Sequence, residues 1–104
     1  MTAKYLQIKL EPRAQQEIGE AFHWWQENRQ AAPALFLDEL TRALDLVRTQ
    51  PHIGQHAQKA SLKGVRRILL RRTRYLLYYC VLQNENFIIV LSLWHANRGR
   101  GPGV

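Results

Sequence analysis

The spacing of apolar side chains divides the chain into a short strand, two helices and a strand-rich half. Residues 4–10, KYLQIKL, alternate between polar and apolar positions, which predicts a half-buried strand at a sheet edge. Residues 12–28 and 36–50 repeat their apolar positions at helical spacing instead. Residues 65–94 then hold three short runs of branched and aromatic side chains, which predicts strands.

The two predicted helices are separated by a break, and each carries an apolar stripe. Pro12 suits a first helical turn, where its missing N–H would have no partner, and Pro33 interrupts the helical pattern. The stripes are Ala14, Ile18, Ala21, Phe22 and Trp25, followed by Phe36, Leu37, Leu40, Ala43, Leu44 and Val47. With a short connection the helices form a hairpin, and its apolar side needs a sheet.

Two adjacent indoles in the first helix cannot both be central to its apolar face. Trp24 and Trp25 point about 100° apart on a helix. We expect Trp25 in the core and Trp24 beside the core or against a partner, and a stacking platform for nucleic-acid bases is the alternative.

Three downstream runs, residues 65–70, 75–82 and 87–94, predict two consecutive hairpins. The first reversal falls on residues 71–74, RRTR, and the second on residues 83–86, QNEN. The middle and last runs are apolar at nearly every position, so both faces of these strands need cover. The helical hairpin covers one face, and the other needs a partner or remains an exposed apolar patch.

These elements follow one another as β-α-α-β-β-β in a single domain, residues 1–104, which is long enough for one modest core. Residues 52–62 lack periodicity and predict a loop, and the glycine-rich tail from about residue 99 is expected to be mobile. The predicted fold class is α+β. It has a small, twisted, mostly antiparallel four-stranded sheet with the N-terminal helical hairpin packed on one face.

Positive charge is concentrated in the strand-rich half. The formal net charge is +7, yet residues 1–58 hold six lysines and arginines against seven acidic residues, whereas residues 59–104 hold nine against one. Such a field attracts nucleic acid or an acidic protein surface. It can also serve solubility alone.

Six arginines are candidates for a binding surface. Arg71, Arg72 and Arg74 project together from the predicted turn, and Arg98 follows the last strand. Arg66 and Arg67 point to opposite faces of a strand, so they cannot share one patch. A basic turn can alternatively be a solvated guard of a sheet edge.

The sequence carries no recognisable metal, nucleotide or nucleophile motif, so we expect neither a metal nor a cofactor. Its four histidines are scattered, and its one cysteine, Cys80, lies in a predicted strand as a small buried apolar residue that cannot form an intramolecular disulfide. No stretch matches a membrane span, and the N-terminus lacks the order of a signal peptide. These features favour a cytoplasmic protein without a membrane partner.

Several short motifs, in this order, resemble those of the RelE/ParE superfamily of bacterial toxins, the plasmid stabilisation type. They are FLDELTRALDLV at 36–47, Pro51 with Gly54, GVRRILL at 64–70, RYLLYYCV at 74–81, IIVLSLWH at 88–95, and Arg98. The resemblance covers about residues 5–98. It implies a helical hairpin on a small twisted sheet, and a toxin held in a hetero-oligomer by an antitoxin that wraps it with a helix and an extended segment.

The resemblance implies one of two targets. RelE-like members cleave mRNA in the ribosomal A site with basic residues and an acid-base residue near the C-terminus, whereas ParE-like members poison DNA gyrase and lack that set. Here Leu69 and Leu76 stand where the RelE-like pattern has basic residues, which favours the ParE-like branch. His95 after the last strand can still act as acid or base.

The leading hypothesis is therefore a ParE-like toxin that inhibits gyrase without catalytic residues of its own. It would contact its target through Arg71, Arg72, Arg74, His95 and Arg98. The alternative is a ribosome-dependent mRNA endoribonuclease with His95, Arg66, Arg67 and Arg98 as its catalytic residues. A third interpretation is a non-toxic module that only sequesters an antitoxin.

Overall fold

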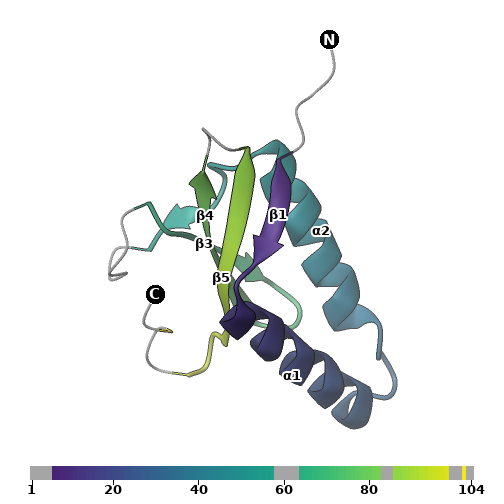
Figure 1. Cartoon of the computed structure of the whole chain (residues 1–104). Helices are drawn as coiled ribbons and strands as arrows, with labels where there is room; N and C mark the ends of the chain where they lie inside the picture. Colours follow the sequence, from purple (N-terminus) through teal and green to yellow (C-terminus); the bar gives the residue numbers. More distant parts are fainter. Residues whose placement is uncertain (1–5, 58–63, 83–85, 99–101, 103–104) are drawn as a thin grey trace.

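The computed structural model describes residues 6–57, 64–82, 86–98 and 102, and it shows two helices on one side of a twisted sheet (Figure 1). The helices are α1 (Pro12–Asn28) and α2 (Leu35–Thr49), and the strands are β1 (Gln7–Leu10), β2 (Gln55–His56), β3 (Arg66–Leu70), β4 (Tyr75–Leu82) and β5 (Phe87–His95). The predicted α+β class is confirmed. The structure adds β2, a two-residue strand in the segment expected to be a loop.

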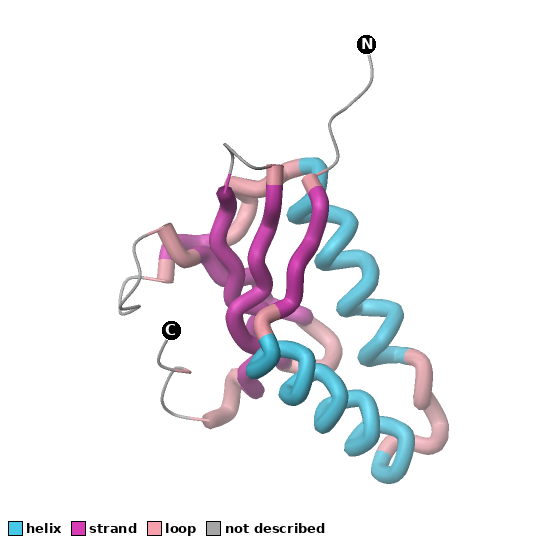
Figure 2. The backbone as a smooth tube through the Cα atoms, in the orientation of Figure 1, coloured by secondary structure: helices cyan, strands magenta, loops and turns pink. Residues whose placement is uncertain are grey.

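The sheet is mixed, and the last strand lies inside it. The strand order is β1-β5-β4-β3-β2, so β1 occupies an edge, as its alternating pattern predicts (Figure 2). β1 runs parallel to β5, with Ile8 beside Ile88, and the other pairs are antiparallel. A bulge shifts the β4–β5 register between Tyr78 and Tyr79, and Leu91 is the extra residue on β5.

The helices start and end close to their predicted positions. Pro12 is the first residue of α1, and the N–H of Arg29 donates to the carbonyl of Trp25 where the helix ends. The buried residues are Ala14, Ala21 and Trp25 in α1 and Phe36, Leu40, Ala43 and Val47 in α2. Leu37, predicted for the stripe, is 46% exposed. It follows Phe36 about 100° around the helix, and Phe36 takes the core position.

The main core lies between the helices and the sheet. Leu70, Leu77, Val90 and Leu93 from β3, β4 and β5 meet the buried side chains of α1 and α2 there. A smaller cluster beside it joins Leu6, Val47, Tyr79 and Ile88. Burial of each large apolar side chain contributes about 1.5–3 kcal/mol, so the predicted hairpin-on-sheet packing supplies most of the stability.

The sheet face away from the helices is partly buried within the chain itself. Val65, Tyr78 and Leu91 form a third cluster there, and partly buried side chains pack against it: Ala57, Leu76, Cys80, Ile89 and Trp94. The face is therefore not the open apolar plane that the strand pattern suggested. Among the described residues, Leu69 and Leu82 are the exposed large apolar side chains of β3 and β4.

Some sequence predictions fall outside the described residues. These are most of the second predicted turn, residues 83–85, the part of the loop at 58–63, and the tail from residue 99, apart from Pro102. In the described segments, neither helix has the length and apolar character needed to cross a membrane.

Candidate functional site

One carboxylate from α2 holds the turn between β3 and β4 in shape. Glu39 accepts hydrogen bonds from the backbone N–H groups of Arg72 and Thr73, each at 2.8 Å, and from the Thr73 hydroxyl at 2.7 Å. Arg74 closes the turn in the left-handed region, with a φ of 69°. Backbone contacts therefore fix the turn and leave the side chains of Arg71, Arg72 and Arg74 exposed.

The same contacts set the charge of Glu39. Burial alone would raise the pKa of this carboxyl, but hydrogen bonds from Arg72 and Thr73 and the charge of Arg72 lower it below its ordinary value of 4.5. Glu39 is therefore ionised at neutral pH. The turn that carries Arg71, Arg72 and Arg74, which we call the arginine turn, is thus pre-organised before any partner binds.

Beside this turn, the end of α1 and the segment after β5 border a hollow of about 660 Å³, which we call the arginine–aromatic pocket. It is lined by Trp24, Trp25, Arg29, Arg72, Thr73, Arg74, Tyr75, His95, Asn97 and Arg98. Four of the five predicted target-binding residues, Arg72, Arg74, His95 and Arg98, thus meet in one place. None of these described lining residues is acidic, so the positive field inside the pocket is strong.

One wall of the pocket is aromatic and comes from α1. Trp25 is buried, as predicted, whereas Trp24 is 44% exposed, and their rings meet edge to face with centroids 5.9 Å apart. The guanidinium carbon of Arg29 lies 5.2 Å from the Trp24 ring centre, within the range of cation–π attraction. Trp24 is a predicted partner contact, whereas Arg29 is not among the predicted site residues. The only local signal is a cation one turn after the indole pair.

Tyr75 and His95 pair directly across β4 and β5, and their rings meet edge to face with centroids 5.0 Å apart. Burial raises the pKa of Tyr75, although a hydrogen bond with Trp25 and the charge of Arg98 lower it in part. The phenol therefore stays protonated at neutral pH. Tyr75 is not among the predicted site residues, because its place in an apolar run indicates core packing.

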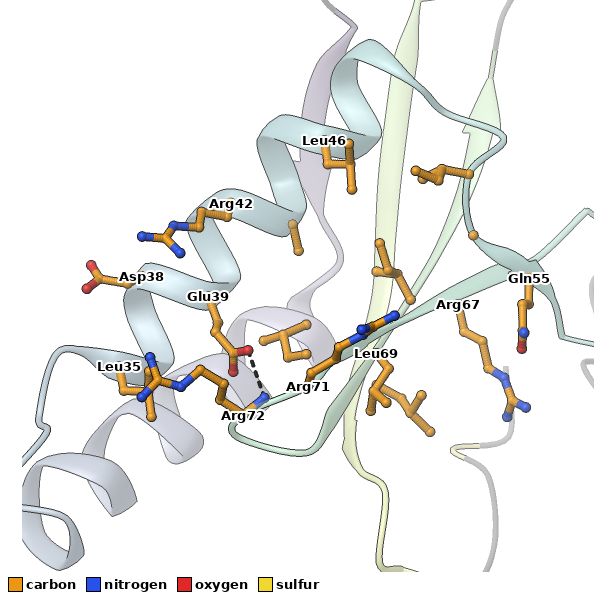
Figure 3. Close-up of a pocket in the computed structure, with 16 residues that line it drawn as sticks. Leu35, Asp38, Glu39, Arg42, Leu46, Gln55, Arg67, Leu69, Arg71 and Arg72 are labelled. Atoms are coloured by element: carbon orange, nitrogen blue, oxygen red, sulfur yellow. Dashed lines mark hydrogen bonds between the residues drawn. The ribbon is translucent and has the colours of Figure 1, made fainter.

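A second hollow of about 880 Å³ lies between α2 and β3, and we call it the α2–β3 groove (Figure 3). Its apolar lining comprises Leu35, Ala43, Leu46, Ile53, Ile68, Leu69, Leu70 and Leu76. Arg67, Arg71 and Arg72 line it from β3 and the turn, and Asp38, Glu39 and Arg42 line it from α2. Arg71, the fifth predicted target-binding residue, thus lines the groove, and Arg72 borders both hollows.

The four residues of the alternative ribonuclease set do not meet in one site. The guanidinium of Arg66 donates hydrogen bonds to the backbone carbonyls of His52 at 3.0 Å and Gly54 at 2.7 Å. Arg67 lines the α2–β3 groove, whereas His95 and Arg98 line the arginine–aromatic pocket. Arg66 therefore has a structural task, anchoring the loop after α2 to β3.

Neither hollow offers a metal site. In the described part of the chain no three His, Cys, Asp or Glu side chains come together to hold an ion. Cys80 is half-buried rather than fully buried, and burial and the charge of Glu11 both raise the pKa of its thiol. The thiol is thus protonated at neutral pH and a poor nucleophile.

A protein-family model decides where this fold belongs. The model of the ParE toxin of the type II toxin–antitoxin system, parDE, matches residues 8–99. The chain belongs to the ParE toxin family. This membership confirms the predicted RelE/ParE superfamily. No curated protein matches this ParE-family chain.

Solved structures share the fold of this ParE-family chain at low sequence identity. A chain of the chromosomal ParDE system from P. aeruginosa is 13% identical, with a TM-score of 0.68 over 90% of this chain and 99% of that one. A chain of the E. coli RelBE toxin–antitoxin complex is 21% identical, with a TM-score of 0.62 over 89% and 99%. A chain of the RelBE2 toxin–antitoxin complex from Mycobacterium tuberculosis is 15% identical, with a TM-score of 0.62 over 88% of this chain and 98% of that one. The fold is thus common to ParE and RelE toxins and does not select a target.

Proposed function

We propose that this chain is a cytoplasmic toxin that inhibits DNA gyrase, stops replication and growth, and is neutralised by a cognate antitoxin in a hetero-oligomer. Membership of the ParE family supports the toxin role. The toxin would act by binding alone, without catalytic residues. Stabilisation of a plasmid carrying the pair would follow from the same activity.

The observation that carries the gyrase proposal is the pairing of Leu69 with Leu76. The two residues are direct cross-strand partners on β3 and β4, and both line the α2–β3 groove. The RelE-like pattern has basic residues at these two positions, where they would stabilise the charge that develops on the phosphate. Two apolar side chains cannot supply that charge.

The arginine turn and the arginine–aromatic pocket supply the proposed target surface. Arg71, Arg74 and Arg98 are exposed and form no salt bridge with any carboxylate among the described residues. Arg71, Arg74 and Arg98 are therefore available to an anionic target, which complementary charge attracts at long range.

The α2–β3 groove suits the proposed antitoxin. Its charged lining holds four arginines, Arg42, Arg67, Arg71 and Arg72, against the two carboxylates of Asp38 and Glu39. With its apolar lining it therefore fits an amphipathic segment of net negative charge. The ParDE and RelBE structures described above come from toxin–antitoxin systems, which supports a partner of this kind.

The proposal is tested by inducing the chain alone in bacteria and pulse-labelling DNA and protein synthesis. We expect DNA synthesis to fall first, and the purified chain to inhibit supercoiling by gyrase. The variant R71A/R72A/R74N and the variant R98A should lose this effect, with asparagine at 74 because it tolerates a positive φ. Lys9→Ala, on the exposed side of β1, is the matched control and should still inhibit DNA synthesis and supercoiling. Unchanged growth on induction would overturn the toxin role and favour a module that only sequesters antitoxin.

The endoribonuclease is the second candidate, and one observation favours it. His95 lies against Tyr75 in a pocket with Arg72, Arg74 and Arg98, so an acid-base group is close to several cations. If protein synthesis falls first, cleavage of translated message should be abolished by His95→Ala. Cleavage that survives this substitution would exclude His95 as the catalytic residue.

A further inference from the structure

We propose that the arginine–aromatic pocket binds a nucleoside phosphate, either a free nucleotide or an unpaired nucleotide of a nucleic acid, with its base against Trp24 and its phosphate among Arg72, Arg74 and Arg98. The inference rests on the proposed function in that the same arginines serve both. It extends that function by assigning a ligand chemistry to the pocket.

The phosphate side of the pocket is cationic and already in position. Arg72 and Arg74 project from the turn that Glu39 fixes through backbone N–H groups, so little order is lost when they meet a ligand. Arg98 adds a third planar cation to the pocket lining, and its guanidinium carbon lies 4.6 Å from the ring centre of Trp94. Guanidinium groups bind phosphate oxygens in bidentate pairs, and the pocket has no acidic lining residue among those described to compete.

The base side is the exposed part of Trp24. An indole that is 44% exposed on the wall of a cationic pocket contributes little to the core, yet every nucleobase can stack on its exposed surface. Arg29 next to this ring adds a flat cation on the base side, on which a base can also stack. Phosphate alone would need neither group.

Polar groups in the lining of the pocket can also hydrogen-bond to the ligand. The N–H of Asn97 donates to Nδ1 of His95 at 3.2 Å, so a neutral His95 carries its proton on Nε2. The Tyr75 hydroxyl stays protonated because burial raises its pKa. A volume of about 660 Å³ also lies within the size range of small-molecule sites.

The test measures binding to the purified full chain with three probes. The probes are ATP, tripolyphosphate, which is a polyphosphate without a base, and a short dye-labelled single-stranded oligodeoxythymidylate. Calorimetry measures binding of ATP and tripolyphosphate, and fluorescence anisotropy measures binding of the oligonucleotide. We expect ATP to bind more tightly than tripolyphosphate. ATP that displaces the oligonucleotide identifies a site for free nucleotides, and binding of the oligonucleotide alone identifies nucleic acid as the source.

Two pairs of matched variants locate the site. Arg74→Asn and Arg71→Asn remove one charge from the same turn, but of the two only Arg74 lines the pocket, whereas Arg71 lines the groove. Trp24→Ala and Leu37→Ala each remove an exposed apolar side chain from a helix. Far-ultraviolet circular dichroism of all four confirms that the fold is retained.

We expect Trp24→Ala to weaken binding of ATP or the oligonucleotide by about tenfold and to leave tripolyphosphate unaffected. Arg74→Asn should weaken all ligands that bind, and Arg71→Asn and Leu37→Ala should stay within about twofold of the parent chain. Equal losses for Arg71→Asn and Arg74→Asn would overturn the inference. So would tripolyphosphate binding as tightly as ATP where ATP binds, or no binding of either ATP or the oligonucleotide. Gyrase inhibition without nucleotide binding refutes this inference alone, and nucleotide binding without gyrase inhibition refutes only the gyrase proposal.

Discussion

The backbone N–H of Gly54 donates a hydrogen bond to the hydroxyl of Tyr79 at 3.0 Å, and that hydroxyl donates to the carbonyl of Pro51 at 2.8 Å. Tyr79 is fully buried in β4, so one phenol fixes the loop that follows α2 to the inside of the sheet. Burial raises the pKa of Tyr79, which keeps its proton available for Pro51. The spacing of Pro51 and Gly54 in the sequence thus has a structural cause.

Gly54→Ala should destabilise the fold by about 1–3 kcal/mol through overpacking. A Cβ at this position would lie 2.6 Å from the Tyr79 hydroxyl and 2.9 Å from the carbonyl oxygen of Arg67. Thermal melting followed by circular dichroism measures the effect. Gly19→Ala is the control, since a Cβ there meets nothing within 4 Å in α1 and should stabilise the helix by about 0.5–1 kcal/mol. The same change in melting temperature for both variants would contradict this account.

Tyr79→Phe should cost about 1–3 kcal/mol because it leaves the N–H of Gly54 and the carbonyl of Pro51 without their buried partner. Urea denaturation should show a lower midpoint with an unchanged m-value. Tyr78→Phe is the matched control: its residue is buried on the opposite face, and its hydroxyl has no hydrogen-bond partner among the described residues. A loss at Tyr78 as large as that at Tyr79 would show that the network is unimportant.

Stability should fall in acid partly through Glu39. The folded-state pKa of Glu39 is lowered, so its contribution is complete at neutral pH and is lost as the pH falls below 4.5 and through the folded value. Glu39→Gln should cost about 1–2 kcal/mol at neutral pH and flatten the acid limb of the stability profile. Urea denaturation at a series of pH values measures this. Asp38→Asn, an exposed neighbour, should leave stability at neutral pH within about 0.5 kcal/mol, and a profile for Glu39→Gln that matches the parent would refute the assignment.

Glu17 should stabilise the part of β5 that extends past the end of β1. Its Oε1 accepts hydrogen bonds from the fully buried Ser92 hydroxyl at 2.7 Å and from the N–H of Leu93 at 3.1 Å. Glu17→Ala should cost about 1–3 kcal/mol, and hydrogen exchange at the amide of Leu93 should become faster. Glu20→Ala removes an exposed carboxylate from the same helix and should change neither the stability nor the exchange rate at Leu93. Unaltered exchange at Leu93 in the Glu17 variant would contradict the role of this carboxylate.

Local pattern was sufficient for most of the fold. Alternation in KYLQIKL predicted an edge strand, and Pro12 marked the start of α1. The parallel pairing of β1 with β5 has no local signal because it joins segments at opposite ends of the sequence. The apolar period placed Leu37 in the core, but the period alone cannot decide between adjacent apolar residues, and Phe36 occupies the site.

The site was less predictable than the fold because packing assembles it. The turn with Arg72 and Arg74 follows from local sequence, whereas Arg29 and Tyr75 reach the pocket only when α1 packs on the sheet. Conversely, charge type makes Arg66 a candidate site residue, but it gives no sign of the two backbone carbonyls to which Arg66 donates in the fold. A count of arginines cannot separate those that bind a partner from those that anchor a loop.

The position of β5 inside the sheet also determines when the sheet can form during synthesis of the chain. β1 pairs along residues 7–10 with residues 87–90, so the first strand has no neighbour until the last strand has been made. On a translating ribosome the helices can form early, but the sheet and the core they cover close only after β5 has emerged. A nascent chain that lacks β5 therefore lacks the assembled surface, and a partner that recognises this surface can bind only after β5 has emerged.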